Sequence, residues 1–123
     1  MPLRFVLDEH LRGGALWKAI QQHNSAGIDP IDVIRVGDPN DLPNGSTDPE
    51  VLRWSWLNDR ILVSLDRRTL PAHLAIHVQT NGRSPGVLIV RPGSMTSRVL
   101  FSLVLIAHAG DSADYQDRIE YIP

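Results

Sequence analysis

Short apolar runs that alternate with helix-like segments are the feature that most constrains the fold of this chain. The strand-like runs occupy residues 3–7, 32–36, 61–65, 86–90 and 118–122. Between them, apolar residues recur at helical spacing over 11–23, 48–59, 70–78 and 94–109. Apolar strands that alternate with helices are typical of a parallel sheet covered on both faces. The sequence therefore predicts an α/β fold with three layers, in which a mostly parallel central sheet of four to five strands has helices on both faces.

The composition is that of a single globular domain over residues 1–123. Cysteine is absent, which excludes disulfides and thiolate zinc sites and leaves carboxylate or imidazole groups as metal ligands. Because Met1 leads straight into a strand-like segment and the apolar run 99–107 is too short to span a bilayer, we expect a cytoplasmic protein without membrane association. The net charge of -2 argues against tight nonspecific binding of nucleic acid, yet it permits a local basic rim.

Two of the predicted strands end in an aspartate, Asp8 after the first and Asp66 after the third. In parallel sheets, ligands bind at the carboxyl ends of the strands, so these carboxylates are expected at one edge. Carboxylates at close range repel each other unless a cation offsets the repulsion. Mg²⁺ and Mn²⁺ prefer oxygen ligands, and such ions align a phosphodiester and generate an attacking hydroxide. The alternative is that both aspartates cap the helices that follow them.

Asp48 is the third acidic candidate, and it follows a loop over residues 37–47 that is rich in glycine and proline. Loops of this length in compact domains are more often functional than idle. The Asp48-Pro49 step also suits a helix start, with Asp48 as the cap and proline at the first helical position. Thr47 and Glu50 offer a competing capping box. The sequence leaves the metal-binding and helix-start interpretations of Asp48 side by side.

Three segments in order resemble the small stand-alone PIN-like family. They are Leu7-Asp8-Glu9-His10-Leu11, Ser46-Thr47-Asp48-Pro49-Glu50 and Ile61-Leu62-Val63-Ser64-Leu65-Asp66. The resemblance implies a three-layer PIN-like domain and a ribonuclease that depends on Mg²⁺ or Mn²⁺. It places the family's catalytic and metal-binding acids on Asp8, Asp48 and Asp66. Many relatives look like toxins of toxin–antitoxin pairs, which implies an RNA substrate and an antitoxin partner.

One position departs from the family pattern. Relatives usually carry another acidic residue two positions after the third-strand aspartate, and here that position holds Arg68. The substitution removes a possible metal ligand and adds a positive charge. Either the guanidinium of Arg68 contacts a substrate phosphate, which its planar fork fits well, or the site is weakened as a nuclease.

Several charged residues near the strand ends are candidates for a supporting role. Glu9 and His10 directly follow Asp8 and are expected at the rim of the site. Arg67, Arg68 and Arg91 come just past predicted strands and are candidates to hold RNA phosphates. The alternative for these arginines is an ordinary solvated position.

Two further groups of residues favour a structural interpretation. His73 and His77 are four apart on a predicted helix, but the catalytic glutamate of a zincin and a third ligand are missing, so a structural pair is favoured. The tryptophans at helical positions are typical of a core or an interface. Because Trp54 and Trp56 point in different directions, one of them is expected to be exposed and to support a homodimer.

The main functional hypothesis is a metal-dependent ribonuclease, and two alternatives from other classes remain open. One is a catalytically silent PIN-like binding module, which Arg68 favours. The other is a phosphoacceptor domain that resembles a response-regulator receiver, with Asp8 and Glu9 as an acidic pair and Asp66 as the acceptor. Such receivers need a lysine after the last strand, and residues 118–122 contain none.

Overall fold

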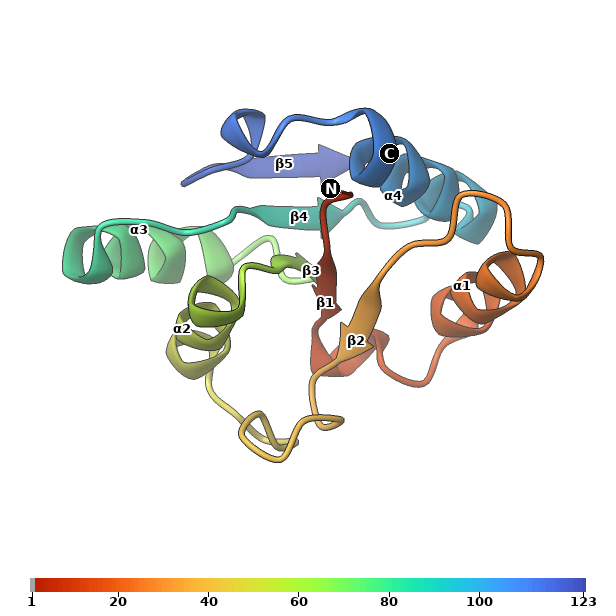
Figure 1. The fold of residues 1–123 in the computed structure, drawn as a ribbon. Coiled ribbons are helices and arrows are strands. Elements are labelled where there is room, and N and C mark those ends of the chain that lie inside the picture. The colour runs from red at the N-terminus through yellow and green to blue at the C-terminus, as the bar shows by residue number, and fades with distance from the viewer. Residues whose placement is uncertain (1) are drawn as a thin grey trace.

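The computed structural model describes residues 2–123 and contains one five-stranded sheet with the strand order β2-β1-β3-β4-β5 (Figure 1). The strands are β1 (Phe5–Leu7), β2 (Val33–Arg35), β3 (Ile61–Ser64), β4 (Val87–Val90) and β5 (Ile119–Ile122). All four neighbouring pairs are parallel. The predicted α/β class is confirmed, and the sheet is wholly parallel.

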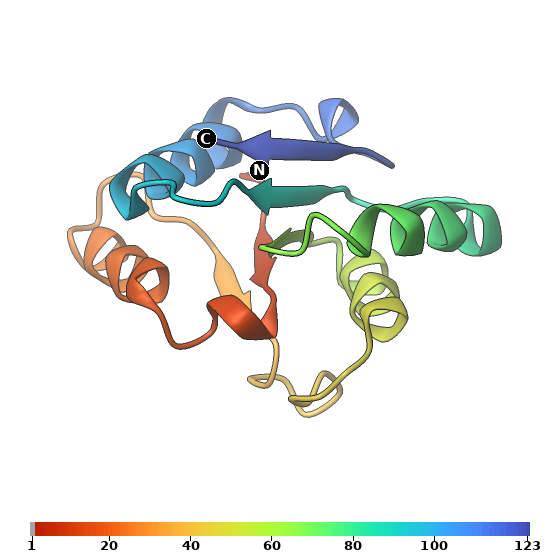
Figure 2. The same cartoon turned by 180° about the vertical axis from the view of Figure 1, so that it is seen from behind.

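Four helices cover the two faces of this sheet. They are α1 (Ala15–Ser25), α2 (Asp48–Asn58), α3 (Leu70–Asn81) and α4 (Thr96–Ala109), and two short 3₁₀ helices, η1 (Glu9–Leu11) and η2 (Ser112–Asp114), lie in connections. Helices α1 and α4 lie on one face, and α2 and α3 lie on the other (Figures 1 and 2). Within residues 2–123, no helix has both the length and the apolar character needed to cross a membrane.

The core is divided by the sheet into two apolar clusters. Leu7 and Val63 pack with α1 and α4, whereas their neighbours Val6 and Leu62 pack with α2 and α3. Successive side chains of a strand point to opposite faces, so a strand buried on both sides must be apolar at every position. Full burial of each such side chain contributes about 1.5–3 kcal/mol. This requirement explains the continuous apolar runs in the sequence.

The chain reverses direction across the sheet between β1 and β3. It steps from β1 to β2 on one side and then returns past β1 to β3 on the other. In doubly wound sheets, such a switch point opens a crevice at the carboxyl ends of the two strands. The last connection differs from the others. From β4 to β5 the chain moves across the sheet in the same direction as from β3 to β4, but α4 lies on the face of α1, whereas α3 lies on the opposite face. The β4-α4-β5 crossover therefore has the opposite hand to the first three.

Two helix boundaries differ from the sequence prediction by three residues or more, and both differences have local reasons. The first helix begins at Ala15 rather than Leu11, because η1 and the extended backbone of Gly14 separate it from β1. Glycine has a low helix propensity, so the Gly13-Gly14 pair favours this break. The third helix continues past Val78 to Asn81 and ends where Gly82 adopts a left-handed conformation, with φ of 87°.

The start of α2 selects one of the two capping registers that the sequence allowed. The Thr47 side chain accepts a hydrogen bond from the Glu50 backbone N–H, and the Glu50 carboxylate accepts one from the Thr47 N–H at 2.9 Å. This arrangement is a capping box, so Asp48 is the first helical residue and not the cap. The Asp48 carboxylate therefore does not cap the helix.

Candidate functional site

Asp8 lies at the switch point, directly after β1 and beside the carboxyl end of β3. The register pairs Leu7 with Val63, which brings Asp8 beside Ser64 at the carboxyl edge. The Ser64 hydroxyl donates to Asp8 Oδ2 at 2.8 Å, and the Glu9 N–H donates to Asp8 Oδ1 at 2.8 Å. Asp8 is only 9% exposed. Its carboxylate is thus held in one orientation at the edge of the sheet.

Ser64 connects the first acidic residue to the second. Besides donating to Asp8, its buried hydroxyl accepts a hydrogen bond from the Asp66 backbone N–H at 3.1 Å. The link fixes the backbone of Asp66 relative to the side chain of Asp8. Sequence reasoning passed over Ser64, although it is the one polar residue in the run Ile61–Leu65 and that break in an apolar strand was a usable signal.

Asp66 holds the turn that leads into α3. Its Oδ1 accepts hydrogen bonds from the backbone N–H groups of Arg68 at 3.0 Å and Thr69 at 2.9 Å, and its Oδ2 accepts one from the Thr69 hydroxyl. These bonds, that of the Thr69 hydroxyl above all, hold the pKa of Asp66 below its usual range. Thr69 was also missed, although aspartate and threonine both commonly form local hydrogen bonds in turns.

Asp48 approaches the other two acids from α2 and contacts a histidine on α3. Its Oδ2 lies 3.8 Å from His73 Nε2. Burial raises the pKa of Asp48, and the negative charges of Asp8 and then Asp66 raise it further, while His73 acts in the opposite sense. The three aspartates therefore share one negative field, although they come from three separate segments.

The two histidines of α3, which the sequence analysis interprets as a structural pair, have different surroundings. His77 is buried, its Nε2 lies 2.8 Å from the Arg83 carbonyl, and its ring meets Trp56 edge-on at 6.0 Å between centroids. These contacts favour the structural interpretation for His77. His73 instead lies beside Asp48 at the acidic edge.

The loop over residues 37–47 is fastened next to Asp8. The Glu9 carboxylate accepts a hydrogen bond from the Gly45 N–H. At the other end of the loop, Arg12 and Arg35 both bind Asp38, at 2.7 and 2.9 Å. Burial alone would raise the pKa of Asp38, but the hydrogen bonds from Arg35 and Arg12 outweigh it and lower that pKa. Glu9 thus positions the segment that leads to Asp48.

The remaining rim residues lie around this edge with different degrees of restraint. His10 lines a pocket on the α1/α4 side together with Leu65, away from the side chains of α2 and α3. Arg67 and Arg68 are exposed, and among residues 2–123 neither forms an ion pair with an acidic side chain. Arg91 is exposed too, and its guanidinium lies 5.5 Å from the centre of the Tyr121 ring.

The donor set has the right chemistry for a hard cation but is not a closed cage. Carboxylate and hydroxyl oxygens are the ligands that Mg²⁺ and Mn²⁺ prefer. Across residues 2–123, however, no three acidic, histidine or cysteine side chains converge into a ready-made metal-binding group. The carboxylates of Asp8 and Asp66 each already accept hydrogen bonds on both oxygens. What the three aspartates share is an edge and a negative field.

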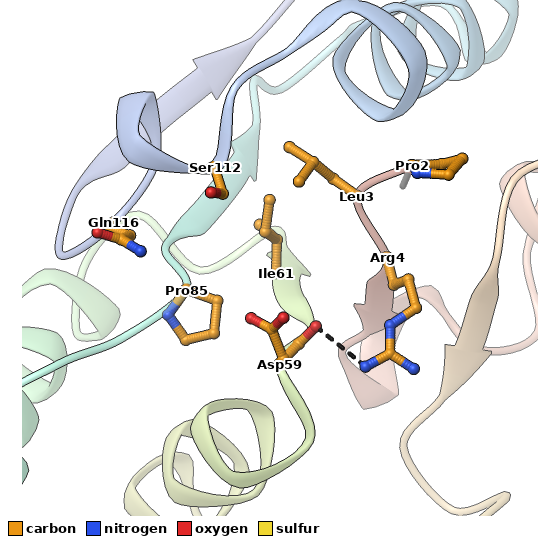
Figure 3. A pocket seen from close by; sticks show the side chains of 8 residues that line it. All are labelled: Pro2, Leu3, Arg4, Asp59, Ile61, Pro85, Ser112 and Gln116. Carbon is orange, nitrogen blue, oxygen red and sulfur yellow. Dashed lines mark hydrogen bonds between the residues drawn. The ribbon is translucent and has the colours of Figure 1, made fainter.

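A well-defined pocket of about 220 Å³ lies at the opposite edge of the sheet (Figure 3). Arg4, which precedes β1, and Ile61, which begins β3, both line it, so it opens at the amino ends of the strands. The Arg4 guanidinium donates to the carbonyls of Asn58 at 2.6 Å and Asp59 at 3.5 Å, which ties β1 to the end of α2. These contacts are structural, and the pocket is remote from the aspartates.

Replacing Thr69 by valine is expected to raise the pKa of Asp66 and to destabilise the protein by roughly 1 kcal/mol at neutral pH. A carboxyl whose folded-state pKa is lowered stabilises the fold above its unfolded pKa, about 3.9 for aspartate, and loses that contribution as the pH falls through the folded pKa. The stability difference should therefore shrink at acid pH. Urea unfolding at several pH values checks this, with Thr69→Ser as the control that keeps the hydroxyl. An equal loss at every pH would contradict it.

Comparison with known proteins identifies no relative of this chain. No family model, no curated protein and no solved structure matches the chain. The resemblance to the PIN-like family stays a prediction that depends on the three segments around Asp8, Asp48 and Asp66.

Proposed function

We propose that this protein is a metal-dependent phosphodiesterase that cleaves RNA, with Asp8, Asp48 and Asp66 as its metal-binding residues. The observation that carries the proposal is the connection at the switch point, where one buried serine hydroxyl joins the Asp8 carboxylate to the Asp66 backbone. Asp48 completes the set from α2, within the field of the other two charges. A concentration of negative charge at the ligand-binding edge of a parallel sheet favours a cation there.

The chemistry of the donor set supports Mg²⁺ or Mn²⁺ as the bound ion. When bound, such an ion polarises a phosphoryl group and lowers the pKa of water. Asp8 supplies a carboxylate fixed by Ser64, and Asp66 supplies one fixed by the turn before α3. Burial and the charges of Asp8 and Asp66 raise the pKa of Asp48, and the charge of a bound cation would oppose that shift. The imidazole of His73, with Nε2 3.8 Å from Asp48 Oδ2, borders this carboxylate on the α3 side.

The basic residues next to the acids support a phosphate-bearing substrate. Arg67 and Arg68 follow Asp66 directly, and both residues are exposed. Guanidinium groups bind phosphate oxygens with two parallel hydrogen bonds, which orients a backbone along the rim. A role as the toxin of a toxin–antitoxin pair would add an antitoxin that covers this edge, and a small adjacent gene would support that role.

The test is cleavage of a mixed RNA pool with Mn²⁺, with Mg²⁺ and with a chelator. We expect cleavage by the wild type with metal, no cleavage with chelator, and at least about a hundredfold slower cleavage by Asp66→Asn. Asp41→Asn removes an exposed carboxylate of the nearby loop and serves as the matched control. No cleavage with any divalent metal, or equal cleavage by Asp66→Asn, would contradict the proposal.

A second candidate function is that of a phosphoacceptor domain, which the strand order favours. The order 2-1-3-4-5 is found in receiver domains, where the site also lies between the first and third strands. This analogy concerns the fold alone. The only lysine of the chain, Lys18, lies on α1, and the opposite hand of the β4-α4-β5 crossover departs from a regular doubly wound sheet. Labelling of Asp66 by a small phosphodonor would favour this candidate.

A third candidate is a silent PIN-like binding module. It is favoured by Arg68, which stands where relatives carry an acidic residue. Metal-independent binding of RNA without cleavage would support it over the nuclease.

A further inference from the structure

Four residues form one row across the sheet on the face that carries α2 and α3. Leu7 pairs with Val63, which sets Asp8 beside Ser64, and the register then aligns Ser64 with Ile89 and Ile89 with Tyr121. Neighbouring strands are about 4.8 Å apart, so Tyr121 lies two strand spacings, about 10 Å, from Ser64. The row leads from the acidic residues to the edge strand β5.

Tyr121 ends this row with an exposed aromatic ring. Its side chain is 45% exposed, whereas Ile89 in the next strand is fully buried beneath the helices. The difference arises because β5 is the edge strand and the α2/α3 layer does not extend fully over it (Figure 2). A hollow lined by Pro71, Ala75 and Ile119 lies between α3 and the beginning of β5, on the same face of the sheet. Tyr121 therefore faces an open surface.

Arg91 lies against this ring and brings a positive charge to the same place. It follows β4 directly, and its guanidinium carbon lies 5.5 Å from the centre of the Tyr121 ring, within the range of a cation–π contact. Among residues 2–123, Arg91 forms no ion pair with an acidic side chain. The pair thus offers a flat aromatic surface, a flat cation and a charge that no carboxylate neutralises.

We propose that Arg91 and Tyr121 form a base-stacking subsite for single-stranded RNA beside the acidic edge. Bases stack on aromatic rings and on guanidinium planes, and the guanidinium can at the same time bind a phosphate. The row of residues places this subsite two strand spacings, about 10 Å, from Ser64, and a short segment of RNA backbone can span that distance. The choice of RNA as the ligand rests on the proposed function. The new element is the position at which the bases of the substrate bind.

The experiment measures binding of a short fluorescent oligoribonucleotide by anisotropy in a chelating buffer, where no cleavage can occur. A matched oligonucleotide with abasic sites is the second probe. We expect Tyr121→Ala to weaken binding of the base-bearing strand roughly tenfold and to leave the abasic strand unaffected. Tyr121→Phe keeps the ring and should bind as the wild type does. Arg91→Ala should weaken binding of both strands, because it removes a phosphate contact as well.

Phe101 provides the matched aromatic control. It is 68% exposed on α4, on the other face of the sheet, and Phe101→Ala should leave binding of both probes unchanged. Equal effects of Tyr121→Ala on both strands, an effect of Phe101→Ala of the same size, or no binding by the wild type would overturn the inference. So would a self-association that Tyr121→Ala abolishes, because the ring would then belong to a contact between copies. If the wild type binds RNA as expected but does not cleave it with any metal, the nuclease proposal is contradicted and the base-stacking subsite is still supported.

Discussion

Replacing Asp8 by asparagine is expected to slow metal-dependent RNA cleavage by at least about a hundredfold while the protein stays folded. The substitution removes a negative charge from the switch point, but an amide of the same shape can still accept the Glu9 N–H. Its amino group faces the Ser64 hydroxyl, which can rotate to accept a hydrogen bond. We therefore expect a cost of roughly 1 kcal/mol in stability and a much larger loss of activity.

Two controls separate these effects of the Asp8 substitution. Thermal unfolding of Asp8→Asn in a chelating buffer measures the structural cost. Ser64→Ala keeps the carboxylate but removes its fixed orientation, so a smaller loss of cleavage, of about 10- to 100-fold, is expected. Cleavage by Asp8→Asn at the wild-type rate would show that this carboxylate does not belong to the site.

Replacing Arg68 by aspartate is expected to strengthen Mn²⁺ binding by about tenfold. The change converts a positive charge into a negative one two residues after Asp66, where relatives of the PIN-like family carry an acid. Unit charges a few ångströms apart in water interact by about 1 kcal/mol. Reversing one charge near the ion is therefore expected to change its affinity by about tenfold. Titration of Mn²⁺ into the variant and the wild type gives the comparison.

The neutral variant Arg68→Gln shows how the gain from Arg68→Asp arises. If charge alone matters, Arg68→Gln should fall between the wild type and Arg68→Asp, and both gains should shrink at high salt. If the new carboxylate binds the ion, Arg68→Asp should exceed twice the effect of Arg68→Gln on the free energy of binding. Unchanged affinity in both variants would contradict a metal site next to this residue.

The layers and strands could be predicted because burial leaves a direct trace in the sequence. A strand covered on both faces is apolar throughout, and β1 and β4 are the clearest examples. The hand of the β4-α4-β5 crossover has no such trace, because α4 carries apolar residues on its exposed side as well as on its buried side. The start of α1 was missed because Leu11 continues the helical spacing of apolar residues, although it lies in η1.

The candidate site was predicted less completely than the fold. Asp8 and Asp66 follow from the rule that strand ends meet at one edge, whereas Ser64, Thr69 and His73 depend on hydrogen bonds and on helix packing. His73 reaches Asp48 only because α2 and α3 pack together, a contact between segments that periodicity does not encode. The Thr47 capping box was visible in the sequence but could not be separated from an Asp48 cap without the backbone conformation.

Calorimetric titration of Mn²⁺ into the metal-free protein tests most directly whether the three aspartates bind a divalent cation. We expect saturable binding by the wild type and by the control Asp41→Asn, and weaker binding by Asp48→Asn. Asp8→Asn and Asp66→Asn should each lose most of this affinity. Absence of binding by the folded wild type, or equal affinity in all four aspartate variants, would contradict a metal site at the switch point between β1 and β3.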